Sequence, residues 1–175
     1  MKDNKMIRYP LILGLIALIA GLLLALVYNV TAPIIEQNAT KRENATIVEM
    51  FGEDAKIEDI SDTLNSDDTS KGVDNVYIVK SESKEYYVYK ITIQDGVHDD
   101  DSNAIVALKN GKIYTLKFTK VGDNYAGAYN TNNYINGIVN KGSLTNSDVV
   151  SGNTATGVNV IESINAAIAH YGRVK

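Results

Sequence analysis

The stretch Asn103–Thr119, NAIVALKNGKIYTLKFT, decides the fold of this chain. It holds two apolar runs with Asn110-Gly111 between them, and this dipeptide in such a setting is the strongest short signal for a β-hairpin. In the second run, every other residue is large and apolar: Tyr114, Leu116 and Phe118. Because side chains alternate between the two faces of a strand, we expect these three on one face. The stretch therefore predicts two antiparallel strands joined by a tight turn.

The alternation extends upstream, so that the region from Val76 to Lys120 predicts an antiparallel sheet of about four strands. In the segment 85–93, the side chains that share one face are Tyr87, Tyr89, Ile91 and Ile93. Near the C-terminus the spacing becomes helical, with an apolar face made of Val160, Ile161, Ile164, Ala167, Ile168 and Tyr171. We expect this helix to end before Gly172. A sheet with flanking helices belongs to the α+β class.

An uninterrupted apolar run, LILGLIALIAGLLLALV, spans Leu11–Val27. Its length is near the lower limit for a helix that crosses a bilayer, and the neighbouring Tyr9 and Tyr28 suit the boundary between water and lipid. The basic residues nearest to the run are Lys2, Lys5 and Arg8 ahead of it and Lys41 and Arg42 well behind it. This asymmetry predicts a single-pass cell-membrane protein with a cytoplasmic N-terminus and an extracytoplasmic remainder.

A cleaved signal peptide is the alternative to an anchor. The small residues of Val30-Thr31-Ala32 resemble a cleavage site, but Pro33 follows directly and disfavours a cut there. The apolar run is also long for a signal peptide. We therefore favour the uncleaved anchor.

The composition excludes several classes of site and partner. The chain has no cysteine, which excludes disulfides, thiolate metal sites, iron–sulfur clusters and a lipoprotein anchor. It holds 17 Lys and Arg against 21 Asp and Glu, and three of the basic residues precede the apolar run. The exported part is therefore acidic and repels phosphate backbones, so we expect no nucleic-acid partner.

Five segments follow from these patterns. They are a cytoplasmic tail at 1–8, a transmembrane anchor at 9–29, a juxtamembrane stalk helix at 30–52, a linker at 53–75 and an extracytoplasmic domain at 76–175. We expect Thr31 to cap the stalk helix, Pro33 to lie in its first turn and Gly52 to end it. The linker is expected because 53–75 is polar, acidic and poor in large apolar residues.

The segment DVVSGNTATG, residues 148–157, directly precedes the C-terminal helix. Small hydroxyl residues and glycine at a helix N-terminus leave backbone N–H groups that favour a phosphate. Thr154 would then place its Oγ close to that phosphate. The alternative is that Thr154 or Thr156 merely caps the helix, which is the more common role of such residues.

This segment resembles the flavinylation motif of the FMN-binding domain family, Asp-x-x-Ser/Thr-Gly-Ala-Thr/Ser-x-Thr/Ser. The family includes the G subunit of the Rnf electron-transport complex and the C subunit of the sodium-translocating NADH:quinone oxidoreductase. The matching positions are Asp148, Ser151, Gly152, Thr154 and Thr156, whereas Asn153 stands where the family usually has alanine. The resemblance implies that Thr154 is joined through its Oγ to the phosphate of FMN by a separate flavin transferase.

The N-terminal part also resembles the membrane-proximal region of Rnf G subunits. The resemblance rests on the apolar run, the segment Thr31–Gln37 (TAPIIEQ) and Met50-Phe51-Gly52. The middle of the chain departs from the family, because segments 96–101 and 122–127 stand in place of its Gly-Tyr-Gly-Gly-like and Glu-Thr-Pro-Gly-Leu-Gly segments. The covalent link depends mainly on the threonine motif, while these departures concern the pocket for the flavin ring.

Together, the resemblance implies a membrane-anchored flavoprotein with covalent FMN that relays electrons as a subunit of an Rnf-like ion-translocating complex. Its partners would be the other membrane subunits and, during maturation, the flavin transferase. No side chain is needed as a catalytic acid, base or nucleophile during turnover. Two alternatives stay open: a cofactor-free binding or structural module of the same fold, and a free-standing electron shuttle of the same family.

Three further features carry weaker hypotheses. His98 with Asp99, Asp100 and Asp101 lacks the spacing of a known calcium loop and reads as a solvated turn rather than a metal site. His170 is expected on the surface or facing a partner. Tyr125 or Tyr129 is a candidate for stacking on a flavin ring.

Overall fold

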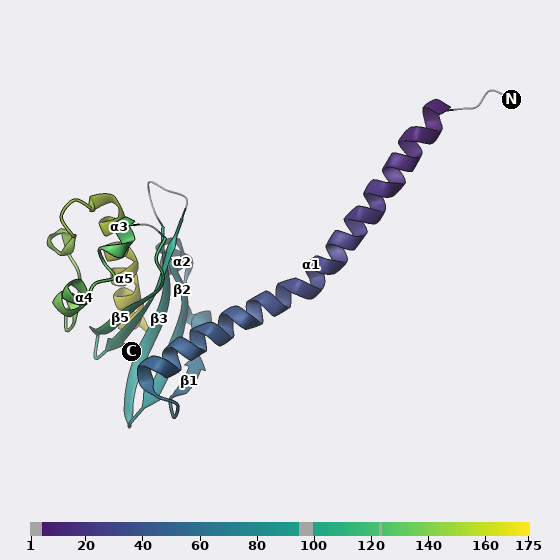
Figure 1. Ribbon diagram of the computed structural model, residues 1–175. Coiled ribbons are helices and arrows are strands. Elements are labelled where there is room, and N and C mark those ends of the chain that lie inside the picture. The colour runs from purple at the N-terminus through teal and green to yellow at the C-terminus, as the bar shows by residue number, and fades with distance from the viewer. Residues whose placement is uncertain (1–4, 95–99, 123) are drawn as a thin grey trace. The chain divides into compact units, whose positions relative to one another are not determined.

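The computed structural model describes residues 5–94, 100–122 and 124–175. The chain divides into two compact units, residues 1–50 and residues 51–175. Helix α1 (Lys5–Phe51) makes up the described part of the first unit and ends on the first residue of the second unit, which is the folded domain. The predicted α+β class is confirmed, since an N-terminal apolar helix is followed by a five-stranded antiparallel sheet with flanking helices (Figure 1).

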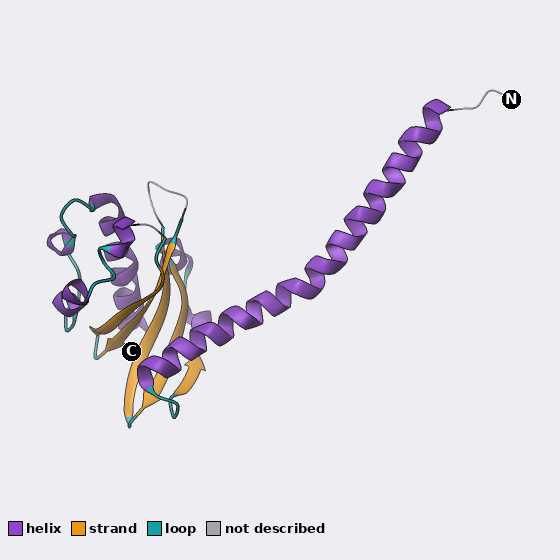
Figure 2. Cartoon of the chain, viewed as in Figure 1, coloured by secondary structure: helices purple, strands orange, loops and turns teal. Residues whose placement is uncertain are grey.

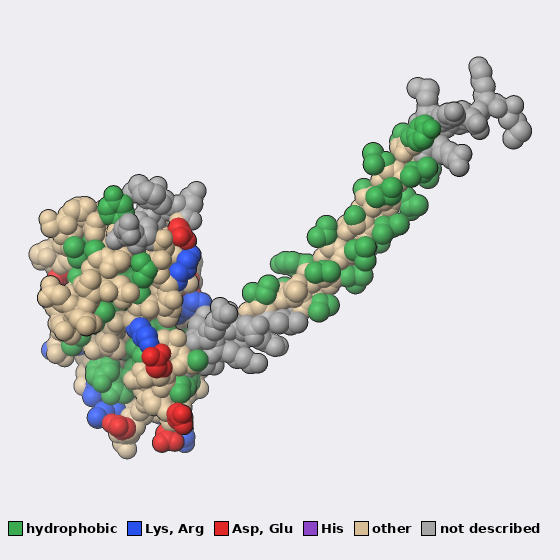
Figure 3. Space-filling model, viewed as in Figure 1, with side chains coloured by type: hydrophobic (Ala, Val, Ile, Leu, Met, Phe, Trp, Pro, Cys, Tyr) green, Lys and Arg blue, Asp and Glu red, His purple; other side chains and the backbone are tan. Residues whose placement is uncertain are grey.

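Helix α1 contains a segment, Tyr9–Ala32, that is long and apolar enough to cross a membrane. Apolar side chains surround this part of the helix and are exposed to solvent (Figure 3). A helix that is hydrophobic all round is typical of a lipid-embedded segment.

The expected start of a separate stalk helix at Thr31 is wrong, because α1 runs unbroken from Lys5 to Phe51. Instead of capping, the Thr31 hydroxyl donates to the carbonyl oxygen of Val27, one turn earlier. The side chains of Pro33 and Glu36 lie outside the described residues. The expected helix end at Gly52 is confirmed, since α1 stops at Phe51 and Gly52 has a φ of +93°.

The sheet, drawn in orange in Figure 2, has the order β1-β2-β3-β4-β5. Every neighbouring pair of strands is antiparallel. Its strands are β1 (Lys56–Asp59), β2 (Val73–Ser81), β3 (Lys84–Ile93), β4 (Ser102–Lys109) and β5 (Lys112–Lys120). The predicted hairpin joins β4 to β5. Asn110 and Gly111 have φ values of +53° and +73°, which are the left-handed conformations that a type I′ turn requires.

The prediction that Tyr114 shares one face of β5 with Leu116 and Phe118 is wrong. The register shifts between the pairs Ala107–Thr115 and Leu108–Ile113, which indicates a β-bulge next to Tyr114. As a result Ile113, not Tyr114, joins Leu116 and Phe118 in the core. The Tyr114 ring instead packs against Tyr86, with the ring centroids 4.8 Å apart.

The segment 53–75, expected to be a linker, is largely structured. It forms β1, the 3-10 helix η1 (Ser61–Thr63) and helix α2 (Ser66–Ser70). Asn65 caps α2 by accepting from the backbone N–H groups of Asp67 and Asp68. Ile60 and Leu64 pack against the main core, so this segment is part of the domain.

The remaining helices are α3 (Asn124–Gly127), α4 (Asn132–Ile138) and α5 (Thr154–Val174), with the 3-10 helix η2 (Asn146–Asp148) before α5. Helix α5 packs across β2, β3 and β4, and its predicted apolar face is confirmed. The helix does not end before Gly172, however, but continues to Val174. The core lies between α5 and one face of the sheet, and the start of α5 lies beside α3.

His170 is buried in this core, so its expected surface position is wrong. Its Nδ1 lies 3.1 Å from the Tyr89 hydroxyl and its Nε2 lies 3.1 Å from the Thr63 hydroxyl. The Thr63 hydroxyl donates to the Ile60 carbonyl, so it accepts from His170 Nε2–H and leaves Nδ1 to accept from Tyr89. His170 therefore joins η1, β3 and α5 as a neutral, fully bonded side chain.

Candidate functional site

Thr154 is the first residue of α5 and lines a pocket of about 210 Å³. The pocket is formed by the turn before α5, the first turn of α5 and one residue of α3. Its lining residues are Tyr125, Gly152, Asn153, Thr154, Ala155 and Thr156. Four of the six residues singled out from the sequence motif are therefore brought together around one cavity.

The N-terminus of α5 carries no side-chain cap. Asn153 is its N-cap residue, yet its side chain makes no capping hydrogen bond. The first helical hydrogen bond runs from the Gly157 N–H to the Asn153 carbonyl oxygen, at 2.9 Å. The N–H groups of the first turn precede this bond, and at a helix start such groups are open to an external acceptor. The alternative that Thr154 or Thr156 merely caps the helix is therefore wrong.

The two threonines of the motif differ in exposure. Thr154 is exposed, whereas Thr156 is only 3% exposed. Of these two threonines, Thr154 is therefore the one that a second protein could reach. Thr156 lines the pocket but is buried.

Ser151 and Gly152 form the exposed turn before the helix. Gly152 has a φ of +88°, a conformation that side chains rarely adopt, so glycine is required for this turn. Ser151 is exposed but does not line the pocket. The turn leads directly into α5, and Thr154 at the start of the helix is exposed.

Asp148 lies outside the pocket and is engaged by its own loop. Its carboxylate accepts from the Thr145 N–H at 2.8 Å and pairs with the Lys141 ammonium. Burial acts to raise the pKa of Asp148, but the Lys141 and Thr145 hydrogen bonds outweigh it and lower that pKa below its usual value of 3.8. Asp148 therefore stays ionised and shapes the turn at η2, and it does not contact the pocket.

The two tyrosines proposed for ring stacking have different roles. Tyr125 is 46% exposed and lines the pocket, so it lies at the rim. Tyr129 is fully buried, and its hydroxyl donates to the Asn153 carbonyl oxygen and accepts from the Val150 N–H. No local sequence pattern predicts these two hydrogen bonds, because they join residues 21 and 24 positions apart.

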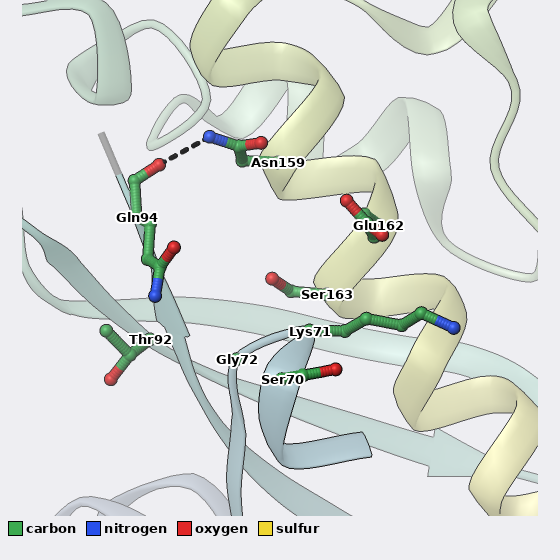
Figure 4. Close-up of a pocket in the computed structure, with 8 residues that line it drawn as sticks. All are labelled: Ser70, Lys71, Gly72, Thr92, Gln94, Asn159, Glu162 and Ser163. Atoms are coloured by element: carbon green, nitrogen blue, oxygen red, sulfur yellow. Dashed lines mark hydrogen bonds between the residues drawn. The ribbon is translucent and has the colours of Figure 1, made fainter. Parts of the chain in front are cut away.

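A second, smaller cavity of about 40 Å³ lies among α2, β3 and α5 (Figure 4). The Asn159 amide nitrogen donates to the Gln94 carbonyl oxygen at 2.7 Å along one side of it. Lys71 at the other side is paired with Asp67 at 2.8 Å. A cavity of this size has room for about two or three water molecules. It is lined by Ser70, Lys71, Gly72, Thr92, Gln94, Asn159, Glu162 and Ser163.

The hypothesis of a metal site at the turn around residue 98 falls partly outside the described residues, which exclude His98 and Asp99. Of its other members, Asp100 pairs with Lys120 at 2.7 Å. Within the described ranges, no group of three or more His, Asp or Glu side chains is placed to hold a metal ion.

In a comparison with known protein families, residues 1–50 match the family model described as the RnfG N-terminal region. No curated protein and no solved structure matches the chain. The match covers the apolar helix and the segment behind it, and lies apart from the threonine motif. The resemblance of the N-terminal part to the G subunit of Rnf complexes, predicted from the sequence, is thereby confirmed.

Proposed function

We propose that the chain is a flavoprotein subunit of an Rnf-type complex, with FMN joined covalently to Thr154. The observation that carries the proposal is the exposed Thr154 hydroxyl at the uncapped start of α5, inside a pocket of about 210 Å³. The N-terminal match to the RnfG region supports it from a separate part of the chain.

The pocket suits a phosphate on physical grounds. The N–H groups of Thr154, Ala155 and Thr156 lie in the first turn of a 21-residue helix, where the helix dipole places partial positive charge. The phosphate would accept hydrogen bonds from these groups, with Gly152 allowing its close approach. We expect Tyr125, which is exposed, to lie beside the flavin ring.

Attachment requires an activated phosphate, because an alcohol does not displace a poor leaving group from phosphorus. A flavin dinucleotide supplies one in its pyrophosphate. The Thr154 Oγ would bond to the flavin-side phosphorus, the bond to the departing nucleoside monophosphate would break, and the hydroxyl proton would pass to a base of the transferase. Thr154 therefore acts once, at maturation, and is not a catalytic residue in turnover.

When bound, the flavin supplies the redox chemistry. The protein would fix it at the start of α5, neutralise part of its phosphate charge and keep it from diffusing away outside the cell. The helix over Tyr9–Ala32 would hold the domain at the membrane that contains the other subunits. These subunits would donate and accept the electrons.

The test is to co-express the full chain with a flavin transferase and to look for flavin fluorescence on a denaturing gel. Wild type should fluoresce, and Thr154→Val should be dark because the acceptor oxygen is gone. Thr156→Val is the matched control, since it removes the hydroxyl of a residue two positions away that is only 3% exposed. It should keep at least part of the signal.

Two results would overturn the proposal. A dark wild-type band would favour the cofactor-free module, whose supporting observation is Asn153 in the motif. Fluorescence of Thr154→Val would mean that the flavin is attached elsewhere.

A further inference from the structure

We infer that the Tyr129 hydroxyl positions the loop that presents Thr154, and that flavin attachment depends on it. The inference rests on the proposed function, since it concerns the same acceptor threonine. Tyr129 does not line the pocket and is a positioning residue, acting through the segment Val150–Asn153, which we call the acceptor loop.

The acceptor loop is a tight turn closed by two sets of hydrogen bonds. Within it, the Asn153 N–H donates to the Val150 carbonyl oxygen at 3.0 Å. Across it, the Tyr129 hydroxyl donates to the Asn153 carbonyl oxygen at 3.0 Å and accepts from the Val150 N–H at 3.2 Å. One hydroxyl therefore ties both ends of the turn, and the next residue after the turn is Thr154.

The hydroxyl is held in the form that this role requires. Burial raises the pKa of Tyr129, and the hydrogen bond from the Val150 N–H lowers it by less. The phenol therefore keeps its proton at physiological pH and remains able to donate to Asn153. Its ring is fixed from the other side by Tyr134, at a centroid distance of 4.9 Å and an interplanar angle of 86°.

Gly157 makes room for this contact. A Cβ at Gly157 would lie 2.2 Å from the Tyr129 Oη and 2.7 Å from the Val149 Cγ1, both far inside contact distance. The backbone of Gly157 has no positive φ, so glycine is needed here for space alone. The Gly157 N–H also donates to Asn153, so that this one carbonyl oxygen accepts from both Tyr129 and the helix.

The loop also keeps the Asn153 side chain away from the helix start. Asparagine is among the best N-cap residues, and a capping Asn153 would occupy the N–H groups that we assign to the phosphate. Its amide nitrogen instead donates to the Tyr125 carbonyl oxygen at 3.3 Å. With Tyr129 fixing the backbone and Tyr125 holding the amide, the first turn of α5 stays open even though the motif has asparagine in place of alanine.

The experiment measures the initial rate of covalent flavin incorporation into the full chain in detergent, with purified flavin transferase and a flavin dinucleotide. Tyr129→Phe should lower kcat/KM for the acceptor protein by about tenfold, because the Val150 N–H and the Asn153 carbonyl each lose a partner. Hydrogen exchange gives a readout that needs no flavin. The Val150 N–H should exchange faster in the variant, whereas the Ile164 N–H in the middle of α5 should not change.

Tyr134→Phe is the matched control. It makes the same chemical change in the ring next to Tyr129, but the buried Tyr134 hydroxyl has no hydrogen-bond partner within the described residues. We expect the attachment rate and the Val150 exchange to equal those of wild type. Gly157→Ala retains the Tyr129 hydroxyl but displaces it, and should reproduce the loss seen in Tyr129→Phe.

The outcomes separate the two proposals. If the wild-type chain never accepts flavin, both the proposed function and the inference are wrong. A labelled wild type together with a Tyr129→Phe variant labelled at the same rate overturns the inference alone. An equal loss in Tyr134→Phe would also overturn it, because ring packing and not the hydroxyl bridge would then be responsible.

Discussion

At the scale of single residues, the two threonines of the motif show why a sequence pattern alone cannot assign an acceptor. Thr154 and Thr156 are chemically identical and two positions apart, but one is exposed and the other is buried. Helical geometry separates them, since residues two apart on a helix point to different sides. The exposure difference supports Thr154 and makes Thr156 a useful control.

Asp148 yields a prediction on stability against pH. Its folded-state pKa is lowered, so its hydrogen bonds with Lys141 and Thr145 stabilise the fold above the unfolded pKa near 3.8. This contribution is lost as the pH falls through the lower, folded pKa. Asp148→Asn should reduce the unfolding free energy at pH 7 by about 1 to 3 kcal/mol. Chemical denaturation of both proteins from pH 7 to pH 3 should show the difference shrinking with acidity; a constant difference would contradict the account.

The motif residues can be recognised in the sequence, but the side chains that hold them in place cannot. Asp148 was expected to bind the cofactor with the rest of the motif, yet it folds back onto Lys141 and Thr145. The role of Tyr129 was missed, because a buried hydroxyl that bridges a distant loop leaves no periodic signal. The burial of His170 has no sequence signal either, because the hydrogen bonds that allow it come from η1 and β3.

At the scale of elements, the sheet followed from the alternation of apolar residues, and the errors occur where a local feature departs from the pattern. The bulge near Tyr114 shifts the alternation by one residue. Strand β1 has a single large apolar residue, Ile57, and is defined by its pairing with β2. A four-residue strand that depends on its neighbour for hydrogen bonds carries almost no signal of its own.

The hydrogen bonds of His170 join α5 to η1 and β3, and their contribution to the stability of the domain should depend on pH. Burial lowers the pKa of His170 below 6.5; Asp68 and the Thr63 backbone oppose this lowering, and Arg173 adds to it. In the folded protein Tyr89 donates to its Nδ1, which disfavours a proton there. Between the folded and unfolded pKa values the unfolded chain binds more protons, so the unfolding free energy falls as the pH drops below about 6.5.

The measurement is the melting temperature of wild type and His170→Gln between pH 7.5 and pH 5. Wild type should lose stability over this range more steeply than the variant. Parallel curves would contradict the assignment of a neutral, buried histidine.

At the scale of the whole molecule, an apolar helix within the region that matches the RnfG N-terminal model precedes, along the chain, a domain that carries the threonine motif. The order of these parts can be predicted from the sequence, because an apolar run of this length indicates a transmembrane helix. We predict that the full chain resists extraction by high salt and alkaline carbonate and dissolves in detergent.

The orientation of the chain in the membrane gives a further prediction. Added protease should degrade the domain in cells whose outer layers have been opened while the cell membrane is intact. Replacing Lys2, Lys5 and Arg8 by glutamate should reduce this export, because the positive charges that retain the N-terminus are lost. Complete protection of the wild-type domain would place it on the cytoplasmic side, against the prediction.

The most direct test of the central claim is the mass of the protein isolated from its own host, followed by fragmentation of the peptide that spans the start of α5. The account predicts a chain heavier by one FMN less one water, with the added mass on Thr154 and with visible flavin absorbance. A mass equal to that of the amino acids alone, or the addition on Thr156 or elsewhere, would contradict it.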